Sequence, residues 1–193
     1  MKYGEIRKKL KKLLPEKRYR HSLGVADTAC EMAARFGCDE DKAYLTGLIH
    51  DCAKYYDAEA TEKLLLENGY TREQLDAIVI PVRHADAGVF VARREFGIDD
   101  PEILRAIRLH TTGGADMTAL DKVIYVADFI EPNRSPFPAL EPAREAAKHD
   151  LDEAVRVCAR STVDHVRENG GNLNENTQKM LEQLNGGKEH DAE

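Results

Sequence analysis

The chain has 193 residues, a formal net charge of −7 at pH 7, 42% hydrophobic residues and 33% charged residues. This length suits one well-buried domain, and the composition is that of a globular protein rather than a disordered one. The acidic balance argues against a general nucleic-acid binder, and no apolar run approaches the roughly 20 residues that span a bilayer. We therefore expect a cytoplasmic protein with no membrane partner and no stable nucleic-acid partner.

Apolar residues at helical spacing, separated by capping and turn signals, predict helices along the whole chain. In chain order the expected helices cover 1–14, 18–36, 40–53, a segment within 55–69, a short helix from 71, then 81–97, 99–110, 119–130, 151–168 and 173–184. The proline-rich residues 131–140 are expected to form a loop. Because no convincing β alternation occurs, we predict an all-α protein with one domain over 1–185 and a disordered tail over 186–193.

An imidazole and a carboxylate stand side by side near the end of an apolar helical stretch, in the run TGLIHDCAK at 46–54. A buried carboxylate without a partner is costly or becomes protonated, and a metal ion is the simplest partner for both His50 and Asp51. Asp51 has two oxygens and can bridge two ions. Lys54, one turn later, places a cation at the rim. This run alone leaves an ordinary His–Asp pair at a helix end equally open.

Four further polar residues occupy helix beginnings, helix ends or apolar helices, where a purely structural role is hard to explain: His21, His84, His110 and Asp128. Asp128 lies inside the most apolar expected helix, where a carboxylate nearly always has a strong partner. Three glycines follow the histidines closely, and a missing side chain there would let a substrate approach: Gly24, Gly88 and Gly113. Gly113 is equally well explained as the residue that ends a helix.

The order His, His-Asp, His, His, Asp resembles the HD-domain superfamily of metal-dependent phosphohydrolases, and in particular its members that bind two metal ions. The strings RYRHSLGVA, GLIHDCAK, HTTGG and VIYVADFIEPNR together look like the YqeK family of symmetrical diadenosine tetraphosphate hydrolases. This resemblance implies a single helical HD domain. It also implies that one metal ion is held by His21, His50, Asp51 and Asp128, and the other by Asp51, His84 and His110, with Asp51 as the bridge.

The donor set is consistent with two divalent ions. Four neutral imidazoles and two carboxylates bring about −2 to two such ions, which leaves roughly +2 for phosphate oxygens and hydroxide. Ligands without thiolate suit iron, manganese, cobalt, nickel or zinc, and the resemblance favours iron. A hydroxide that bridges the ions is the expected nucleophile, and attack at a central phosphorus of the tetraphosphate would release two nucleoside diphosphates.

Fixed cations near the ions would stabilise charge on the phosphoryl oxygens. Lys54 is the first candidate for such a cation. Lys54 and Asp51 are the two residues that we expect to act in catalysis. Arg134, in the loop beyond Asp128, is the second, and Arg83, beside His84, is the third. Thr111 is a further candidate for hydrogen bonding to phosphate. Tyr55, Tyr56 and Phe137 are nearby aromatic residues, but the sequence does not place them well enough to claim that they stack on a base.

Three other functions remain open from the sequence. The first is another nucleotide phosphohydrolase or a cyclic-dinucleotide phosphodiesterase, although the Gly-Tyr-Pro signature of the latter does not occur here. The second is a di-iron oxygenase, for which a phosphate-binding rim would be unnecessary. The third is a metal-stabilised binding module without catalysis. The sequence also leaves the oligomeric state open, with a homodimer as one option.

Overall fold

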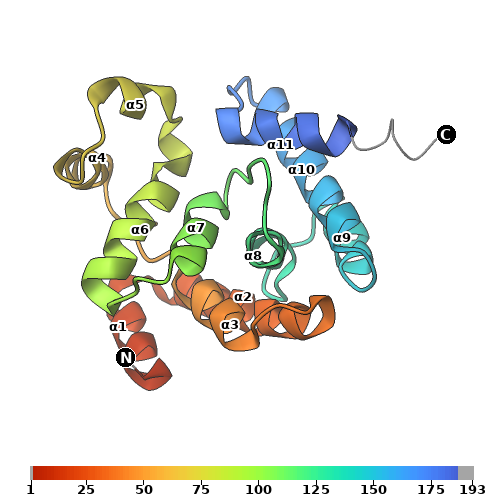
Figure 1. Ribbon diagram of the computed structural model, residues 1–193, viewed down its shortest axis with the longest axis horizontal. Coiled ribbons are helices and arrows are strands. Elements are labelled where there is room, and N and C mark those ends of the chain that lie inside the picture. The colour runs from red at the N-terminus through yellow and green to blue at the C-terminus, as the bar shows by residue number, and fades with distance from the viewer. Residues whose placement is uncertain (1, 187–193) are drawn as a thin grey trace.

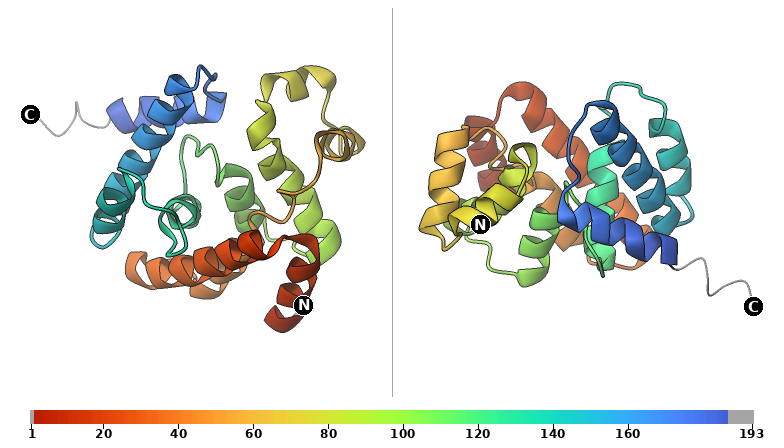
Figure 2. Two further views of the ribbon diagram at one scale, coloured as in Figure 1. Left: turned by 180° about the vertical axis from the view of Figure 1, so that it is seen from behind. Right: turned by 90° about the horizontal axis from the view of Figure 1, so that it is seen from above.

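The computed structural model describes residues 2–186, and every regular element in that range is a helix (Figures 1 and 2). The elements are α1 (Tyr3–Leu13), α2 (Glu16–Phe36), α3 (Glu40–Ile49), α4 (Ala58–Glu67), α5 (Arg72–Ala77), the 3₁₀ turn η1 (Ile80–Val82), α6 (Arg83–Phe96), α7 (Pro101–Leu109), α8 (Ala119–Ile130), α9 (Leu140–Ala146), α10 (Leu151–Glu168) and α11 (Glu175–Gly186). The all-α prediction is confirmed. The predicted tail lies outside the described residues, apart from Gly186 at the end of α11.

The helix boundaries follow from the capping residues. Gly37 and Gly97 end α2 and α6 in the left-handed conformation, with φ of 71° and 66°. Asp39 and Asp100 accept hydrogen bonds from backbone N–H groups at the beginnings of α3 and α7. Thr71 forms the predicted capping box at the beginning of α5.

One predicted helix end is wrong, and one helix was not predicted. Helix α3 ends at Ile49 rather than at 53, and the chain continues in short turns in which the N–H groups of Cys52 and Lys54 donate to the carbonyls three residues before them. These tight turns let His50 and Asp51 both direct their side chains inward. The segment after 140, for which no helix was predicted, forms α9, although Pro142 lies in its first turn, where proline is tolerated.

Buried apolar side chains form two clusters. One joins α8 to α9, α10 and part of α2, and the other joins α3, α6 and α7 to α1 and α4. Helix α2 serves both, because Val25 belongs to one cluster and the adjacent Ala26 to the other. The functional residues described below come from helices of both clusters, so their positions depend on how the clusters pack together.

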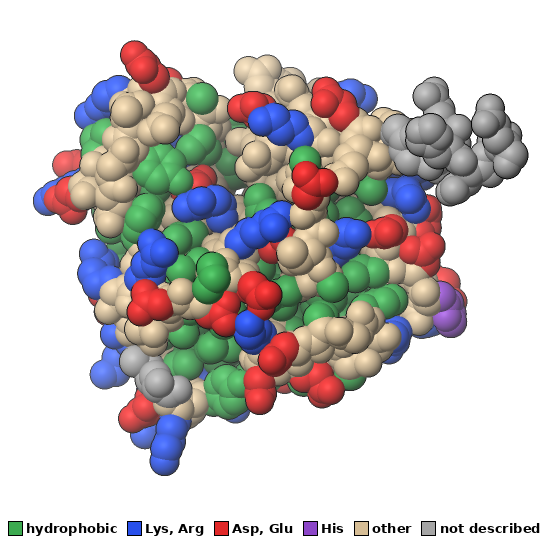
Figure 3. Space-filling view, viewed as in Figure 1, with side chains coloured by type: hydrophobic (Ala, Val, Ile, Leu, Met, Phe, Trp, Pro, Cys, Tyr) green, Lys and Arg blue, Asp and Glu red, His purple; other side chains and the backbone are tan. Residues whose placement is uncertain are grey.

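On the face that Figure 3 shows, basic and acidic side chains are interspersed. In the described range, no helix is long and apolar enough to cross a membrane.

Candidate metal centre

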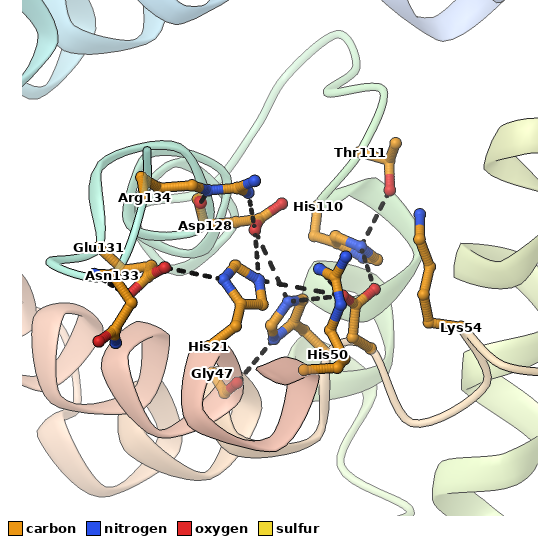
Figure 4. Close-up of polar contacts among 12 residues, drawn as sticks. His21, Gly47, His50, Lys54, His110, Thr111, Asp128, Glu131, Asn133 and Arg134 are labelled. Atoms are coloured by element: carbon orange, nitrogen blue, oxygen red, sulfur yellow. Dashed lines mark hydrogen bonds and ion pairs between the residues drawn. The ribbon is translucent and has the colours of Figure 1, made fainter. Parts of the chain in front are cut away.

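All six residues predicted as metal ligands converge at one place between the two apolar clusters. His21 comes from α2, His84 from the first turn of α6, Asp128 from α8, and His110 from the end of α7, while His50 and Asp51 follow α3 directly. All except Asp128 are buried, with His50 and Asp51 only 0% and 2% exposed. Figure 4 shows His21, His50, His110 and Asp128 directed toward one another.

Asp51 lies between two sets of imidazole nitrogens. Its Oδ2 is 3.5 Å from Nε2 of His50 and 3.9 Å from Nε2 of His21. Its Oδ1 is 3.3 Å from Nε2 of His84 and 3.4 Å from Nε2 of His110. The two oxygens of one carboxylate therefore face different histidine pairs, as a bridging ligand requires.

Asp128 complements the first set. Its Oδ1 lies 2.9 Å from Nε2 of His21 and 3.8 Å from Nε2 of His50. The ligand atoms of His21, His50 and Asp51 all lie within 4.8 Å of one another, and so do those of Asp51, His84 and His110. Each set is compact enough to surround one ion.

The outer nitrogen of every histidine faces an oxygen atom. Nδ1 of His50, His84 and His110 lies 2.7, 2.9 and 2.7 Å from the carbonyl oxygen three residues earlier. Nδ1 of His21 lies 3.1 Å from Oε1 of Glu131. Because these oxygens only accept, the contacts favour the tautomer in which Nδ1 carries the proton and donates it, and Nε2 of each ring faces the centre.

Lone pairs that face carboxylate oxygens repel each other unless a proton or a cation lies between them. His50 Nε2 and Asp51 Oδ1 are buried and have no hydrogen-bond partner among the described residues, and His21 Nε2 has only the carboxylate oxygen of Asp128 at 2.9 Å. Buried polar atoms are rarely left in this state. Nitrogen and carboxylate donors without thiolate suit divalent first-row metals, so the residues present fit such ions.

Burial and neighbouring charges shift the pKa values of Asp51, Asp128 and His84. Burial would raise the pKa of Asp51, but the surrounding His50, His110 and His84 lower it well below its usual value. The pKa of Asp128 is likewise lowered, against the effect of burial, by its contact with His21 and by neighbouring positive charge. Burial lowers the pKa of His84. Both carboxylates are therefore ionised, and His84 is neutral, in the forms that bind metal.

The predicted rim residues take up different positions. Lys54 Nζ is 3.3 Å from Nε2 of His84, and Thr111 Oγ1 is 2.9 Å from Nε2 of His110, so both border the second set. Arg134 donates to Asp128 Oδ1 at 2.6 Å and to the Asp128 carbonyl at 2.8 Å. Arg83 instead donates to the carbonyls of Leu75 and Ile78 at 2.7 and 3.0 Å, which fastens the end of α5. Its role in substrate binding stays a prediction.

Sequence reasoning missed two residues of the centre. Arg18 donates to Asp51 Oδ2 at 2.8 Å, and its position three residues before His21 on α2 was a usable signal, because such residues share a helix face. Glu131 is 1% exposed, and its Oε2 accepts from Asn133 N at 2.7 Å while its Oε1 accepts from His21. Figure 4 shows Glu131 and Asn133 on the side of His21 away from Lys54.

The prediction that glycines admit the substrate is wrong, because protein atoms fill these spaces. A Cβ at Gly24 would lie 2.3 Å from Glu131 Oε2, and one at Gly113 would lie 2.3 Å from Met180 Sδ. A Cβ at Gly88 would lie 3.0 Å from a methyl carbon of Ile107. Gly24 thus makes room for the carboxylate that holds His21.

Comparison with known proteins gives concordant matches. A family model described as HD domain matches residues 18–133. A Bacillus subtilis (strain 168) protein named bis(5'-nucleosyl)-tetraphosphatase, symmetrical, is 40% identical over 158 residues, which make up 80% of this chain and 82% of that protein. A Staphylococcus aureus (strain NCTC 8325 / PS 47) protein of the same name is 36% identical, over 79% of each chain.

A solved structure is also similar. The crystal structure described as a predicted HD superfamily hydrolase involved in NAD metabolism, from Clostridium acetobutylicum, matches with a TM-score of 0.90 and 39% identity. The match covers 95% of this chain and 97% of that chain. The similarity therefore extends over nearly the whole fold.

Proposed function

The chain belongs to the HD domain family, and we infer that it is a symmetrical bis(5'-nucleosyl)-tetraphosphatase. It hydrolyses the phosphoric anhydride at the middle of diadenosine tetraphosphate (Ap4A) and releases two molecules of ADP. Relatives of this name match most of the chain at 36–40% identity. The clustered histidines and carboxylates agree with the dependence of HD-domain hydrolases on divalent metal ions.

We propose that His21, His50, Asp51 and Asp128 hold one ion and that Asp51, His84 and His110 hold the other. The observation that carries this proposal is that the two oxygens of Asp51 face different Nε2 pairs, at 3.3–3.9 Å. When bound, the ions supply positive charge for phosphoryl oxygens and lower the pKa of coordinated water toward about 7. Iron is the metal that we propose first, ahead of manganese, cobalt, nickel and zinc.

The chain's own cations have defined tasks in this reaction. Arg134 uses Nε and one terminal nitrogen for Asp128, so its remaining N–H groups are free to grip phosphate oxygens. Burial lowers the pKa of Lys54, but Asp51 and Asp128 partly offset this effect, and its ammonium group lies beside His84. Lys54 and Thr111 would donate to phosphoryl oxygens on the His84 side of the centre, where charge develops in the transition state.

Product analysis tests the activity. Purified protein incubated with Ap4A is expected to give ADP alone on ion-exchange chromatography, whereas AMP together with ATP would contradict symmetrical cleavage. A panel with other nucleotides and cyclic dinucleotides belongs in the same experiment. Turnover of another member, with Ap4A left intact, would overturn the assignment in favour of a different phosphohydrolase.

The two-ion site is tested with His84→Ala. This variant is expected to lose about half of the bound metal and at least 100-fold in kcat, because metal-site ligands control affinity and activity together. His149→Ala is a matched control, since that side chain is 76% exposed on α9's C-terminal side. Full activity in His84→Ala would contradict the two-ion mechanism. A cytoplasmic location, the lack of a nucleic-acid partner and a homodimer stay predictions.

A further inference from the structure

A cavity of about 390 Å³ opens beside His21, and we call it the His21 cavity. It is bounded by α2, by the turns after α3 and by the loop after α8, and its lining residues are Lys17, Arg18, His21, Tyr55, Glu131, Asn133, Arg134, Ser135 and Phe137. This volume lies within the range of about 300–1,000 Å³ that small-molecule sites occupy. Because His21 itself lines it, the cavity leads directly from the metal centre.

Three cationic side chains line the His21 cavity, together with the buried carboxylate of Glu131. Arg18 and Arg134 donate to Asp51 and Asp128 at 2.8 and 2.6 Å, and their side chains are still 25% and 34% exposed. Each guanidinium has more donors than these contacts use, and exposed Lys17 adds a third positive charge. Phosphates that extend from the centre into this cavity would meet three cations in succession.

The outer part of the cavity is aromatic. Tyr55 is 54% exposed, an unusual position for a large ring, and within residues 2–186 it has neither a hydrogen bond nor a ring partner. Phe137 is held from behind by Phe129, with ring centroids 5.0 Å apart at 82°. The rings of Phe137 and Tyr55 could stack on a base, since every base has a face that can stack, while the neighbouring cationic side chains bind the phosphates attached to the nucleoside.

Two neighbouring cavities fit a nucleoside at the centre less well. The one that contacts His84, together with Lys54 and Arg83, has only about 180 Å³. A larger one of about 880 Å³, between α10 and the loop after α8, shares Arg134 and Phe137 with the His21 cavity but has no predicted metal ligand in its lining. A nucleotide bound there would contact Arg134 but none of the predicted metal ligands.

We propose that the His21 cavity binds one nucleoside diphosphate half of the substrate, with the base stacked on Tyr55 and Phe137 and the phosphates on Arg18 and Arg134. This inference rests on the proposed function, since it places one half of a dinucleotide that is cleaved at the centre. It makes Tyr55 a residue of base recognition. The central anhydride then lies over Asp51, and the second half extends past Lys54.

Two readouts test the proposal. Tyr55→Ala is expected to raise the KM for Ap4A by about 5- to 100-fold with kcat changed less than threefold, which corresponds to the loss of one base stack. The Kd for ADP, measured by calorimetry, should rise by a similar factor. The Kd for inorganic tripolyphosphate, which has no base, should stay within twofold. Tyr55→Phe keeps the ring and should restore the KM of the original protein.

Controls separate this proposal from its alternatives. Tyr3→Ala removes another exposed tyrosine, which is 38% exposed on α1. This variant should change neither the KM for Ap4A nor the Kd for ADP. Arg160→Ala alters the 880 Å³ cavity, so a raised KM in that variant with no effect in Tyr55→Ala would move the base there and overturn the proposal. If Tyr55→Ala still cleaves Ap4A symmetrically with an unchanged KM, the proposed binding of the base in the His21 cavity is wrong, but the proposed activity stands. Weaker ADP binding in Tyr55→Ala supports the cavity even if Ap4A is not the substrate.

Discussion

The four central histidines differ in what holds their outer nitrogen. Three donate to backbone carbonyls, whose positions are set by the helices, whereas His21 donates to the carboxylate of Glu131. A carboxylate makes the imidazole a stronger electron donor and fixes its orientation. The pKa of Glu131 is lowered, against the effect of burial, by His21 and by the N–H groups of Asn133, so the carboxylate is ionised.

Glu131→Gln tests this carboxylate as a positioning residue. The amide retains one oxygen for His21, but its NH2 group would face N–H donors of Asn133, at positions where Oε2 now accepts at 2.7 and 2.9 Å. We expect metal affinity to fall by about 10- to 100-fold, measured by competition with a chromophoric chelator. Glu141→Gln, on the exposed face of α9, should bind metal normally. Equal affinity in the two variants would show that Glu131 is structural.

Protons compete with metal at His21. Burial would lower its pKa, but contacts with Asp128 and Glu131 outweigh burial and raise it above the usual value. The proton must leave before Nε2 can bind an ion, so metal affinity should fall as the pH drops through this raised pKa. In chelator titrations from pH 8 to pH 5, Glu131→Gln is expected to move the midpoint of the loss to lower pH, because it removes a charge that favours the protonated ring without removing a proposed metal ligand.

Among the elements, the contact between α2 and α3 depends on one glycine. A Cβ at Gly47 would lie 2.8 Å from Ala26 Cα and 3.0 Å from the Val25 carbonyl oxygen, so the two helices approach too closely for any side chain there. The Gly47 carbonyl also accepts from Nδ1 of His50 at 2.7 Å. This contact therefore sets both the helix packing and the orientation of a central histidine.

Gly47→Ala is expected to reduce the free energy of unfolding by about 1–3 kcal/mol, as overpacking of a tight interface does, and to weaken metal binding. Urea denaturation followed by circular dichroism measures the first effect, and metal analysis measures the second. Gly4→Ala is the matched control, because a Cβ there meets nothing within 4 Å. At this exposed position of α1 that change should stabilise by about 0.5–1 kcal/mol. A neutral Gly47→Ala would show that the helices can separate without cost.

Elements with strong local signals could be predicted from the sequence, and those fixed by tertiary contacts could not. The bounds of α8 and α10 match the predicted ranges, since their apolar periodicity and boundaries are local features. The end of α3 was misplaced because the turns at 50–54 are stabilised by the inward contacts of His50 and Asp51. Glu131 was missed because its partner lies 110 residues away in the chain. The spacing of Arg18 from His21 indicated the right face of α2, but not its partner Asp51, which lies 33 residues away.

For the molecule as a whole, the centre links the two apolar clusters. His21 and Asp128 belong to α2 and α8, and His84 and His110 belong to α6 and α7, so bound ions would connect the two halves of the core. Without ions, Arg18 and Arg134 already pair with the central carboxylates and offset their charge. The metal-free chain should therefore fold, although with lower stability.

Metal removal tests this link. Protein treated with a chelator and dialysed is expected to retain its helical circular dichroism signal but to unfold at a lower temperature. Ions that bind only the folded chain stabilise it by about 2.7 kcal/mol for each site at 100 times Kd, so Tm should rise steeply up to two equivalents of added metal and only logarithmically beyond them. Arg134→Gln should enlarge the difference in Tm between the metal-loaded and metal-free forms. In this variant no guanidinium offsets the negative charge of Asp128 when no ion is bound. A Tm that does not depend on metal would mean that the ions do not couple the two clusters.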